Sequence, residues 1–429
     1  MTSQTQASSL HRTSLWRTVF ALTATFVVIA AGSPAAPAQT FSVLHYFTGG
    51  ADGQFPFAGV TVGPSGVLYG TSDTGGAHDA GTVFKLNQVN SAWVFSPLYE
   101  FTGGSDGGNP EGGVVIGPSG ALFGTAAYGG ANVGLVFELR PPAAFCRSVL
   151  CYWDQTVLHT FTARPDGAYP AYENLTFDQA GNIYGTTEGG GVSGYGTVFE
   201  LTPSGGGYTE SILHNFGSGT DGQSPFAGVV FDAAGDMYGT TPNGGTGTEC
   251  QESCGTVYQL MPSNGGWLEN VLVNFGGANG EHPYGNLLID ASGNLYGTTN
   301  GGGQNGVGQV VFKLAPSEGG WTYSALYSFT SCESSGGLAM DAAGDLFGVC
   351  LAGAGAGWIF ELTNCSETCT LIDLHDFNGR DGNFPYAGPV LDANGNLYGS
   401  TVYGGPVNCG GSGCGVVWEI VGVGAPQKK

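Results

Sequence analysis

The tetrapeptide Leu68-Tyr69-Gly70-Thr71 decides the fold, because related tetrapeptides follow six more times along the chain. The repeat units are centred on its aromatic residue: Tyr69, Phe123, Tyr184, Tyr238, Tyr296, Phe347 and Tyr398. Successive copies are 54, 61, 54, 58, 51 and 51 residues apart. This period is longer than one solenoid coil and is typical of one four-stranded blade of a propeller.

The composition indicates an all-β chain. Of 429 residues, 79 are glycine, only 10% are charged and 12% are aromatic. Glycine at this level, without a collagen triplet and between short apolar runs, indicates many short strands joined by tight turns. Helix signals are almost absent after residue 40.

One repeat unit, residues 221–275, shows the expected elements most clearly. It contains an apolar first strand (228–231), a hairpin turn (232–235), a second strand with the repeated motif (236–241), a third strand (255–260) and a more polar fourth strand (267–275). A continuously apolar strand is typical of burial on both faces, and alternation is typical of an edge facing water. We therefore expect the first strand to be innermost and the fourth to be outermost.

The two ends of the repeat array predict a closed ring. The array begins with a lone fourth strand (41–48) and stops after a third strand (415–421). An open array would leave two unpaired sheet edges, which favour aggregation. We therefore predict a seven-bladed β-propeller over residues 39–424, closed by pairing of 41–48 with 415–421 and followed by a short tail at 425–429. An open β-solenoid is the alternative.

The first 38 residues predict export. Arg12 and Arg17 precede an apolar run at 19–31, and Ala36-Pro37-Ala38 resembles a small-residue cleavage site. The run is too short to span a bilayer comfortably, so we expect a signal peptide over 1–38 rather than an anchor helix. The mature chain would then be secreted, to the extracellular space, the periplasm or the cell surface, with no membrane span of its own.

The charge of the mature chain excludes some partners. It would keep 8 basic and 33 acidic residues, a formal charge of −25. Such a charge repels phosphate backbones and anionic lipid surfaces, so we expect neither nucleic acid nor a membrane surface as a partner. An acidic surface also keeps a protein soluble, and we expect a monomer.

The ten cysteines predict five disulfides in an exported chain. Four close pairs stand out, and the remaining two residues are left for each other: Cys146 with Cys151, Cys250 with Cys254, Cys365 with Cys369, Cys409 with Cys414, and Cys332 with Cys350. Metal binding by the close pairs is the alternative, but no histidine lies beside them. Such short loops remove little chain entropy, so the bridges would fix loops rather than hold the fold.

The repeat unit resembles a known family. Its pattern F-T-G-G-x-D-G-x-x-P-[FY]-A-G, followed by D-x-x-G-[ND]-[LM]-Y-G-T-T-x-x-G-G and G-T-V-F-[EK]-L, is similar to the GloVer (Gloeo/Verruco) tandem repeat of bacterial exported proteins over residues 41–421. The resemblance implies a surface or secreted repeat protein with a varied C-terminal anchor and no assigned reaction. This chain departs from that pattern, because it ends in Gly-Ala-Pro-Gln-Lys-Lys without an apolar tail.

Ligands of propellers usually bind over the central channel, on the face that carries the loops between outer and next inner strands. The repeat places aspartates and aromatic residues there: Asp52, Asp106, Asp166, Asp221 and Asp381, with Phe57, Tyr172, Phe226, Tyr284 and Tyr386. Carboxylates beside aromatic rings are typical of surfaces that hold sugars, or cations through oxygen ligands. For the aspartates we favour a different interpretation, in which each one hydrogen-bonds the backbone of its own turn, because they recur in nearly every unit.

The histidines and a second set of aspartates are interpreted as structural. Four histidines share one outer-strand position that holds valine in another unit, so we expect ring packing rather than metal binding there: His45, His159, His214 and His375. Aspartates three residues before a glycine predict hairpin turns rather than calcium loops: Asp178, Asp232, Asp290, Asp341 and Asp392. We expect no metal and no cofactor.

Glu111, Glu173 and Glu188 are the candidates for catalysis, because they break the repeat on the ligand face. Two carboxylates at a defined separation could serve glycoside cleavage. The sequence contains no nucleophile elbow, phosphate loop or triad spacing. We favour a non-catalytic binding or surface-interaction module, with extracellular polysaccharide or a surface protein as partner. A polysaccharide-active hydrolase or lyase and a purely structural envelope repeat are the alternatives.

Overall fold

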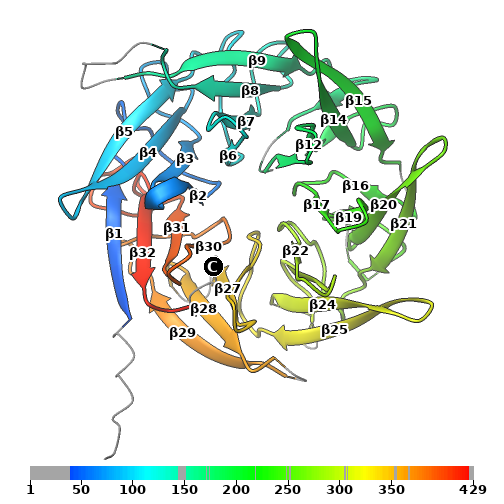
Figure 1. Cartoon of the computed structure of the whole chain (residues 1–429). Helices are drawn as coiled ribbons and strands as arrows, with labels where there is room; N and C mark the ends of the chain where they lie inside the picture. Colours follow the sequence, from blue (N-terminus) through cyan, green and yellow to red (C-terminus); the bar gives the residue numbers. More distant parts are fainter. Residues whose placement is uncertain are drawn as a thin grey trace, which may run out of the picture. The chain divides into compact units, whose positions relative to one another are not determined.

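The computed structural model describes residues 39–424 except 144–150, 171, 173, 218, 248, 251–252, 304–305, 307, 352–354 and 366–367. Its strands form seven four-stranded antiparallel sheets, arranged as blades around a central channel, so the predicted β-propeller is confirmed (Figure 1). The only helical segment among these residues is the 3-10 turn η1 (Pro64–Gly66). No helix in the described part of the chain is long and apolar enough to cross a membrane.

Each blade is ordered from an inner to an outer strand. Blade 1 has β2 (Val60–Val62), β3 (Leu68–Ser72), β4 (Thr82–Val89) and β5 (Ala92–Glu100). Blade 2 has β6 (Val115–Ile116), β7 (Leu122–Ala126), β8 (Leu135–Arg140) and β9 (Asp154–Thr160). Blade 3 has β11 (Thr176–Phe177), β12 (Ile183–Thr187), β14 (Thr197–Ser204) and β15 (Gly207–Asn215).

Blades 4 to 6 repeat this order. Blade 4 has β17 (Val230–Phe231), β18 (Met237–Thr241), β20 (Thr256–Ser263) and β21 (Gly266–Asn274). Blade 5 has β22 (Leu288–Ile289), β23 (Leu295–Thr298), β24 (Val310–Ser317) and β25 (Gly320–Ser328). Blade 6 has β26 (Ala339–Met340), β27 (Leu346–Cys350), β28 (Trp358–Thr363) and β29 (Thr370–Asp376). Two small ladders lie in loops: β10 (Gly167–Ala168) with β13 (Gly189–Gly190), and β16 (Gly222–Gln223) with β19 (Asn243–Gly244).

Blade 7 combines both ends of the described chain and closes the ring. It has β30 (Val390–Leu391), β31 (Leu397–Thr401), β32 (Val416–Val421) and, outermost, β1 (Thr40–Tyr46). Strand β1 pairs with β32 from Thr40 opposite Val421 to Tyr46 opposite Val416. Closure through 41–48 and 415–421 is therefore confirmed.

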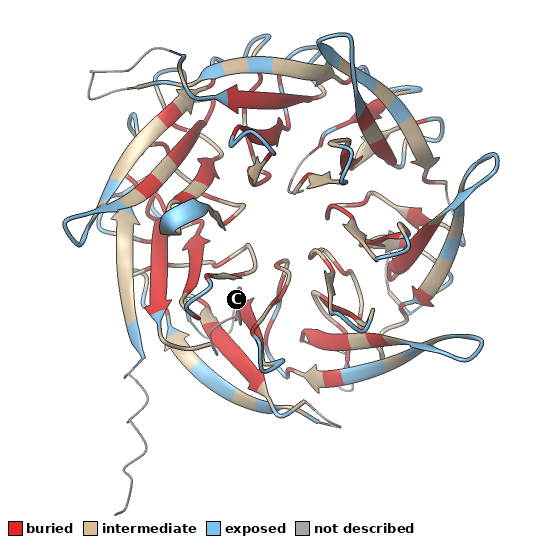
Figure 2. Cartoon of the chain, viewed as in Figure 1, coloured by how far each residue is buried: buried red, intermediate tan, exposed pale blue. Residues whose placement is uncertain are grey.

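The burial of the inner strands is partial, whereas that of the second strands is nearly complete. The inner strands are the innermost ones, as predicted, but they span only two or three residues and most of their side chains are half-buried. The second strands, which carry the repeated motif, are the ones buried almost throughout (Figure 2). The side chains of the inner strands pack alternately on the two neighbouring blades. In blade 4, Val230 packs on the apolar cluster that includes Leu287 of blade 5, and Phe231 packs on the cluster that includes Tyr184 of blade 3. The predicted packing on both faces is therefore confirmed, although the burial of most of these side chains is partial.

The glycine of the repeated motif makes room for an aromatic ring of the third strand. Gly70 is paired with Phe84, and a Cβ atom on Gly70 would lie 2.5 Å from the Phe84 ring. Every blade has such a pair: Gly124 with Phe137, Gly185 with Phe199, Gly239 with Tyr258, Gly297 with Phe312, Gly348 with Phe360, and Gly399 with Trp418. All seven aromatic partners are fully buried.

The hydroxyl of the motif connects one blade to the next. Thr71 Oγ1 donates a 3.0 Å hydrogen bond to the carbonyl of Gly112 in blade 2. Equivalent hydroxyls donate to the following blade from Thr186, Thr240, Thr298 and Ser400. The bond from Ser400 to Pro56, at 2.8 Å, joins blade 7 to blade 1.

The motif tyrosine supports the hairpin before it. Tyr238 Oη donates a 3.0 Å hydrogen bond to Asp232, whose other oxygen accepts from the backbone N–H groups of Ala234 and Asp236. The same bond from tyrosine to aspartate occurs at Tyr184, Tyr296 and Tyr398. The interpretation of these aspartates as hairpin-turn residues is confirmed.

Four of the five predicted disulfides are present: Cys250–Cys254, Cys332–Cys350, Cys365–Cys369 and Cys409–Cys414. The fifth predicted pair includes Cys146, which lies outside the described residues. Within the described chain there is no free cysteine.

Replacement of a motif glycine should destabilise the propeller. In Gly297→Ala the added methyl would lie 2.5 Å from the Phe312 ring and 2.9 Å from Leu287, so we expect a loss of about 1–3 kcal/mol in the free energy of unfolding. The control is Gly265→Ala, where no atom lies within 4 Å and the expected change is within about 0.5 kcal/mol. Denaturant unfolding followed by circular dichroism gives both values. Equal losses in the two variants would contradict this account.

Candidate binding site at the channel mouth

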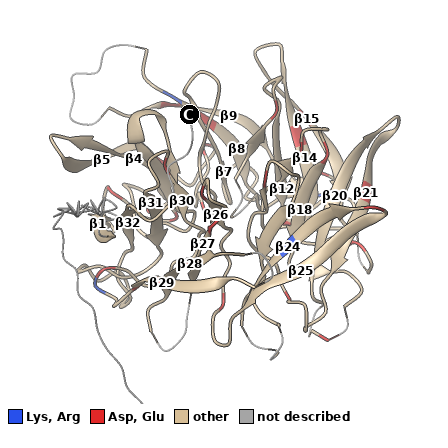
Figure 3. Cartoon of the chain, turned by 60° about the horizontal axis from the view of Figure 1, so that its bottom comes forward, with Lys and Arg blue, Asp and Glu red and all other residues tan. Residues whose placement is uncertain are grey.

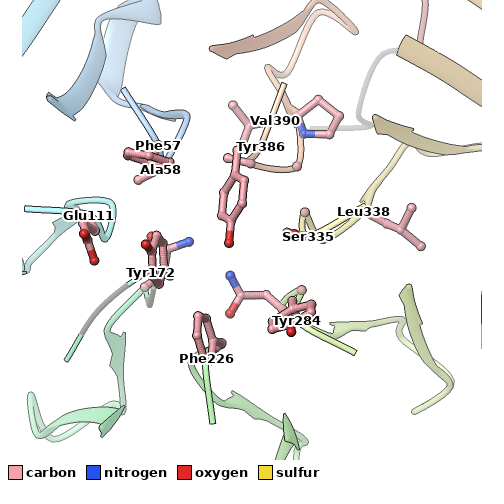
Figure 4. A pocket seen from close by; sticks show the side chains of 18 of the residues that line it. Phe57, Ala58, Glu111, Tyr172, Phe226, Tyr284, Ser335, Leu338, Tyr386 and Val390 are labelled. Carbon is pink, nitrogen blue, oxygen red and sulfur yellow. The ribbon is translucent and has the colours of Figure 1, made fainter. Parts of the chain in front are cut away.

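The central channel opens among residues that occupy one repeated position, three or four residues before each inner strand. We call these residues the mouth ring: Phe57, Glu111, Tyr172, Phe226, Tyr284, Ser335 and Tyr386 (Figure 4). All seven line one cavity of about 240 Å³. Five members are aromatic, and blades 2 and 6 break the pattern with a carboxyl and a hydroxyl group.

The five aromatic members of the mouth ring pack on one another. The rings of Tyr172 and Phe226 are stacked with centroids 5.3 Å apart, and Phe226 meets Tyr284 edge-on at 5.2 Å. Phe57 contacts both Tyr386, at 5.5 Å, and Tyr172, at 5.9 Å. All five are half-buried. The structure therefore brings together the aromatic residues that the sequence placed on the ligand face.

Amide groups and bare backbone complete the cavity. Asn174 and Asn286 line it, and the Asn286 side-chain oxygen accepts a 2.9 Å hydrogen bond from the backbone of Gly228. Gly336 packs directly against the backbone of Gly388 in blade 7, so neither position has room for a side chain. Backbone and small polar groups thus contribute to the wall on the side of blades 5 to 7. Tyr284, Leu338, Tyr386 and Val390 complete that wall.

The opposite side of the mouth is acidic. Burial raises the pKa of Glu111 to about 8, and the charges of Asp73 and Glu188 add to the shift, while a hydrogen bond with Tyr172 opposes it. Burial also raises the pKa values of Asp73 and Glu188. Glu111 is therefore mostly protonated at neutral pH and can donate a hydrogen bond into the cavity.

Two further groups of aromatic residues flank the mouth. On one side Tyr128 and Tyr169 meet edge-on at 5.9 Å and are 48% and 39% exposed. On the other side Tyr403 contacts Phe55 at 5.5 Å and Phe384 at 5.7 Å. Phe384 in turn lies 6.1 Å from Tyr386 of the mouth ring. These aromatic groups extend the site from the cavity onto the surface.

A shared left-handed backbone conformation, fixed by hydrogen bonds to the preceding blade, positions three of these flanking residues. Phe55, Tyr169 and Phe384 each precede the repeated proline and adopt the left-handed conformation, with φ of 59°, 57° and 61°. Their backbone N–H groups donate to carbonyls of the preceding blade, as in the 2.9 Å bond from Phe55 to Cys414. The contact between blades thus maintains a conformation that is unfavourable for these residue types.

Sequence reasoning named Glu111 and Glu188, which the structure brings close together at the mouth. It missed Asp73 and these flanking aromatic residues. Asp73 and Glu188 occupy one repeat position directly after the second strand, where other units have Ala127 or Pro242. The available signal was this departure from the repeat in loops that belong to the ligand face. Comparison of the units position by position would have found it.

The predicted aspartates do not converge on the cavity. Asp52 accepts hydrogen bonds from Thr48 of its own turn and lies 3.1 Å from Nε2 of His45. The same turn arrangement holds Asp106, Asp166, Asp221 and Asp381, and none of the five lines the cavity. Each of the four outer-strand histidines pairs with such an aspartate, a contact that sequence reasoning did not anticipate. Of the catalytic candidates, Glu173 lies outside the described residues.

The fold defines a seven-bladed propeller built from one tandem repeat. The chain belongs to the Gloeobacter/Verrucomicrobia repeat family, whose model matches residues 33–248, 150–337 and 249–420. Among curated proteins, none matches this chain significantly.

Two solved structures share the fold at low sequence identity. One is a fungal alcohol oxidase of the AA5 family in complex with copper, with a TM-score of 0.56 and 14% identity over 89% of this chain and 76% of that one. The other is the extracellular domain of a putative one-component system from B. thetaiotaomicron, with a TM-score of 0.52 and 13% identity over 88% of this chain. This chain spans 40% of that second protein's length. At such identities the similarity shows the fold alone.

The raised pKa of Glu111 predicts a pH-dependent stability. A carboxyl whose pKa is higher in the folded than in the unfolded state favours folding while protonated, and this contribution is lost as the pH rises toward 8. We therefore expect Glu111→Gln to raise the free energy of unfolding by about 1–3 kcal/mol at pH 9, with a smaller change at pH 5. Urea unfolding at both pH values measures it. The exposed Glu318→Gln serves as control, and a pH-independent effect of Glu111→Gln would refute the assignment.

Proposed function

We propose that this protein is a secreted binding propeller that holds an extracellular glycan at the mouth ring. The observation that supports this most is the convergence of five half-buried aromatic rings around a cavity that also offers amide, hydroxyl and carboxyl groups. Sugars present apolar ring faces that pack on aromatic side chains and hydroxyls that need hydrogen-bonding partners.

The size of the cavity suits a small part of a glycan. Its volume of about 240 Å³ lies below the usual range of ligand pockets, roughly 300–1,000 Å³. One sugar unit would therefore enter the mouth. Further units would lie on the flanking aromatic groups, in which Tyr128 and Tyr169 are exposed and Tyr403 is half-buried.

The charge around the mouth favours a neutral or cationic glycan. Asp73 and Glu188 lie beside Glu111 on one side of the opening. Acidic residues outnumber basic ones in the sequence, and Figure 3 shows the same for the described residues. A polysaccharide rich in carboxylate or sulfate groups would meet repulsion of the same sign. The proposed ligand is accordingly not an anionic polymer.

Binding can be tested with the mature chain on a glycan array, followed by calorimetry with the neutral oligosaccharides that bind. Tyr386→Ala and Phe226→Ala should each lower the affinity at least tenfold, because each removes an aromatic surface in the mouth. Leu268→Ala, an exposed apolar residue on β21, should bind as the unaltered protein does. Circular dichroism checks that the variants are folded. Absence of binding to any glycan, or unchanged binding by Tyr386→Ala, would refute the proposal.

Export is part of this proposal and has its own test. The four disulfides fit an oxidising compartment, and the first 38 residues carry the features of a signal peptide. Expression of the full chain in a secreting bacterial host should give an exported product whose N-terminus is Gln39. N-terminal mass spectrometry of the exported protein decides this. A product that keeps residues 1–38 would contradict signal-peptide cleavage.

A second candidate function is acid–base cleavage of a polysaccharide, and one observation favours it. Glu111 has a pKa of about 8 beside the carboxylates of Asp73 and Glu188, so one group can hold a proton while a neighbour is ionised. Release of new reducing ends from a bound neutral glycan, lost in Glu111→Gln but with binding retained, would support it. Binding without turnover by the unaltered protein would leave the binding function alone.

A further inference from the structure

The outer strands of neighbouring blades contact each other through two repeat positions. The residue at the histidine position of one blade faces a residue on the outer strand of the next blade, and that residue lies four positions before the next blade's own histidine position. His45 stacks on Phe95 with ring centroids 4.2 Å apart, and His375 stacks on Phe41 at 3.5 Å. In these two interfaces an aromatic ring covers the histidine.

A glutamate replaces that aromatic ring in two consecutive interfaces. Glu210 on β15 faces His159 on β9, and Glu269 on β21 faces His214 on β15. The aspartate of the following turn joins each pair and forms two triads: His159, Asp166 and Glu210, and His214, Asp221 and Glu269. In each triad one donor atom from every residue lies within 4.8 Å of the others, and all six side chains are half-buried.

The distances between histidine and aspartate within the triads are too long for charge-assisted hydrogen bonds. His159 Nε2 lies 3.4 Å from Asp166, and His214 Nε2 lies 3.5 Å from Asp221, whereas a charge-assisted hydrogen bond measures about 2.7–2.9 Å. Within the described part of the protein these two nitrogen atoms are buried without a hydrogen-bonding partner. The same is true of Oε1 in Glu210 and in Glu269.

Two half-buried carboxyl groups so close together require a compensating positive charge or a proton. In each triad the two carboxyl groups and the imidazole each present one donor atom within 4.8 Å of the other two. A cation at their centre could therefore be coordinated by all three residues.

The donor set and its spacing indicate which cation. Zinc binds nitrogen and oxygen donors at about 2.0–2.2 Å in a tetrahedron, whose edges are then about 3.4 Å long. The distances from His159 to Asp166 and from His214 to Asp221 match that edge. The separation of 4.0 Å between His214 and Glu269 is longer, so this triad must contract on binding. An imidazole ligand disfavours calcium and magnesium, which prefer oxygen alone.

We propose that each triad binds one Zn²⁺ ion through the histidine Nε2 and one oxygen of each carboxylate, with water in the fourth position. The ions tie the outer strands of blades 2, 3 and 4 to one another. No triad of this kind forms at the histidines in blades 6 and 7, because Phe41 and Phe95 occupy the place of the glutamate.

The test uses untagged mature protein, freed of metal with EDTA and titrated with ZnCl₂ by calorimetry, with metal content measured by mass spectrometry. We expect two equivalents of zinc per chain and a higher midpoint of thermal unfolding when zinc is present. Glu210→Gln and Glu269→Gln should each remove one equivalent, and the double variant both. His45→Gln, in an interface without glutamate, should leave the stoichiometry unchanged.

Three results would overturn the proposal: no stoichiometric zinc binding by the unaltered chain, binding that survives in the double variant, or a preference for Ca²⁺ over Zn²⁺. If the glutamine variants fail to fold, His159→Asn and His214→Asn test the same two sites by removing the imidazole ligand instead of the carboxylate. Replacement of zinc by Co²⁺ gives a further readout, because the visible absorption of cobalt reports coordination by imidazole and carboxylate. Spectra unchanged by either histidine substitution would place the ion elsewhere.

Discussion

The pairing of β1 with β32 is the constraint on which the whole molecule depends. A single four-stranded blade cannot bury both of its faces, and in a closed ring each blade is covered on both sides by neighbours. The apolar cluster between blades 7 and 1 shows this, since Phe84 and Leu68 of blade 1 pack with Tyr398 and Val417 of blade 7. Without this pairing, two blades would expose apolar faces and unpaired edges.

Within that ring, each residue of the repeated tetrapeptide has its own physical role. In blade 4, Met237 is buried in the core, Tyr238 supports the preceding hairpin, and Gly239 admits the ring of a third-strand aromatic residue. Thr240 donates a hydrogen bond to the next blade. Because the four roles are distinct and recur in nearly every unit, the motif specifies the blade and its junction together.

The distinctive chemistry lies where the repeat is broken on this rigid frame. Glu111 and Ser335 stand in the mouth ring where five other blades present an aromatic residue. Glu210 and Glu269 stand at blade interfaces where other outer strands carry an aromatic, aliphatic or amide residue. A symmetrical scaffold thus presents asymmetric groups at fixed positions, which is how propellers and barrels acquire specific sites without changing their fold.

The sequence by itself determined the number of blades, their four strands, the closure of the ring and the convergence of the mouth aromatics. These features depend on periodicity and on local strand and turn signals, which each unit carries within itself. Only the tertiary structure decided that Asp52 serves its own turn, that Asp73 lies beside Glu111, and that Glu210 reaches His159. The last two contacts join different blades and depend on side-chain direction, and no pattern within one unit records either.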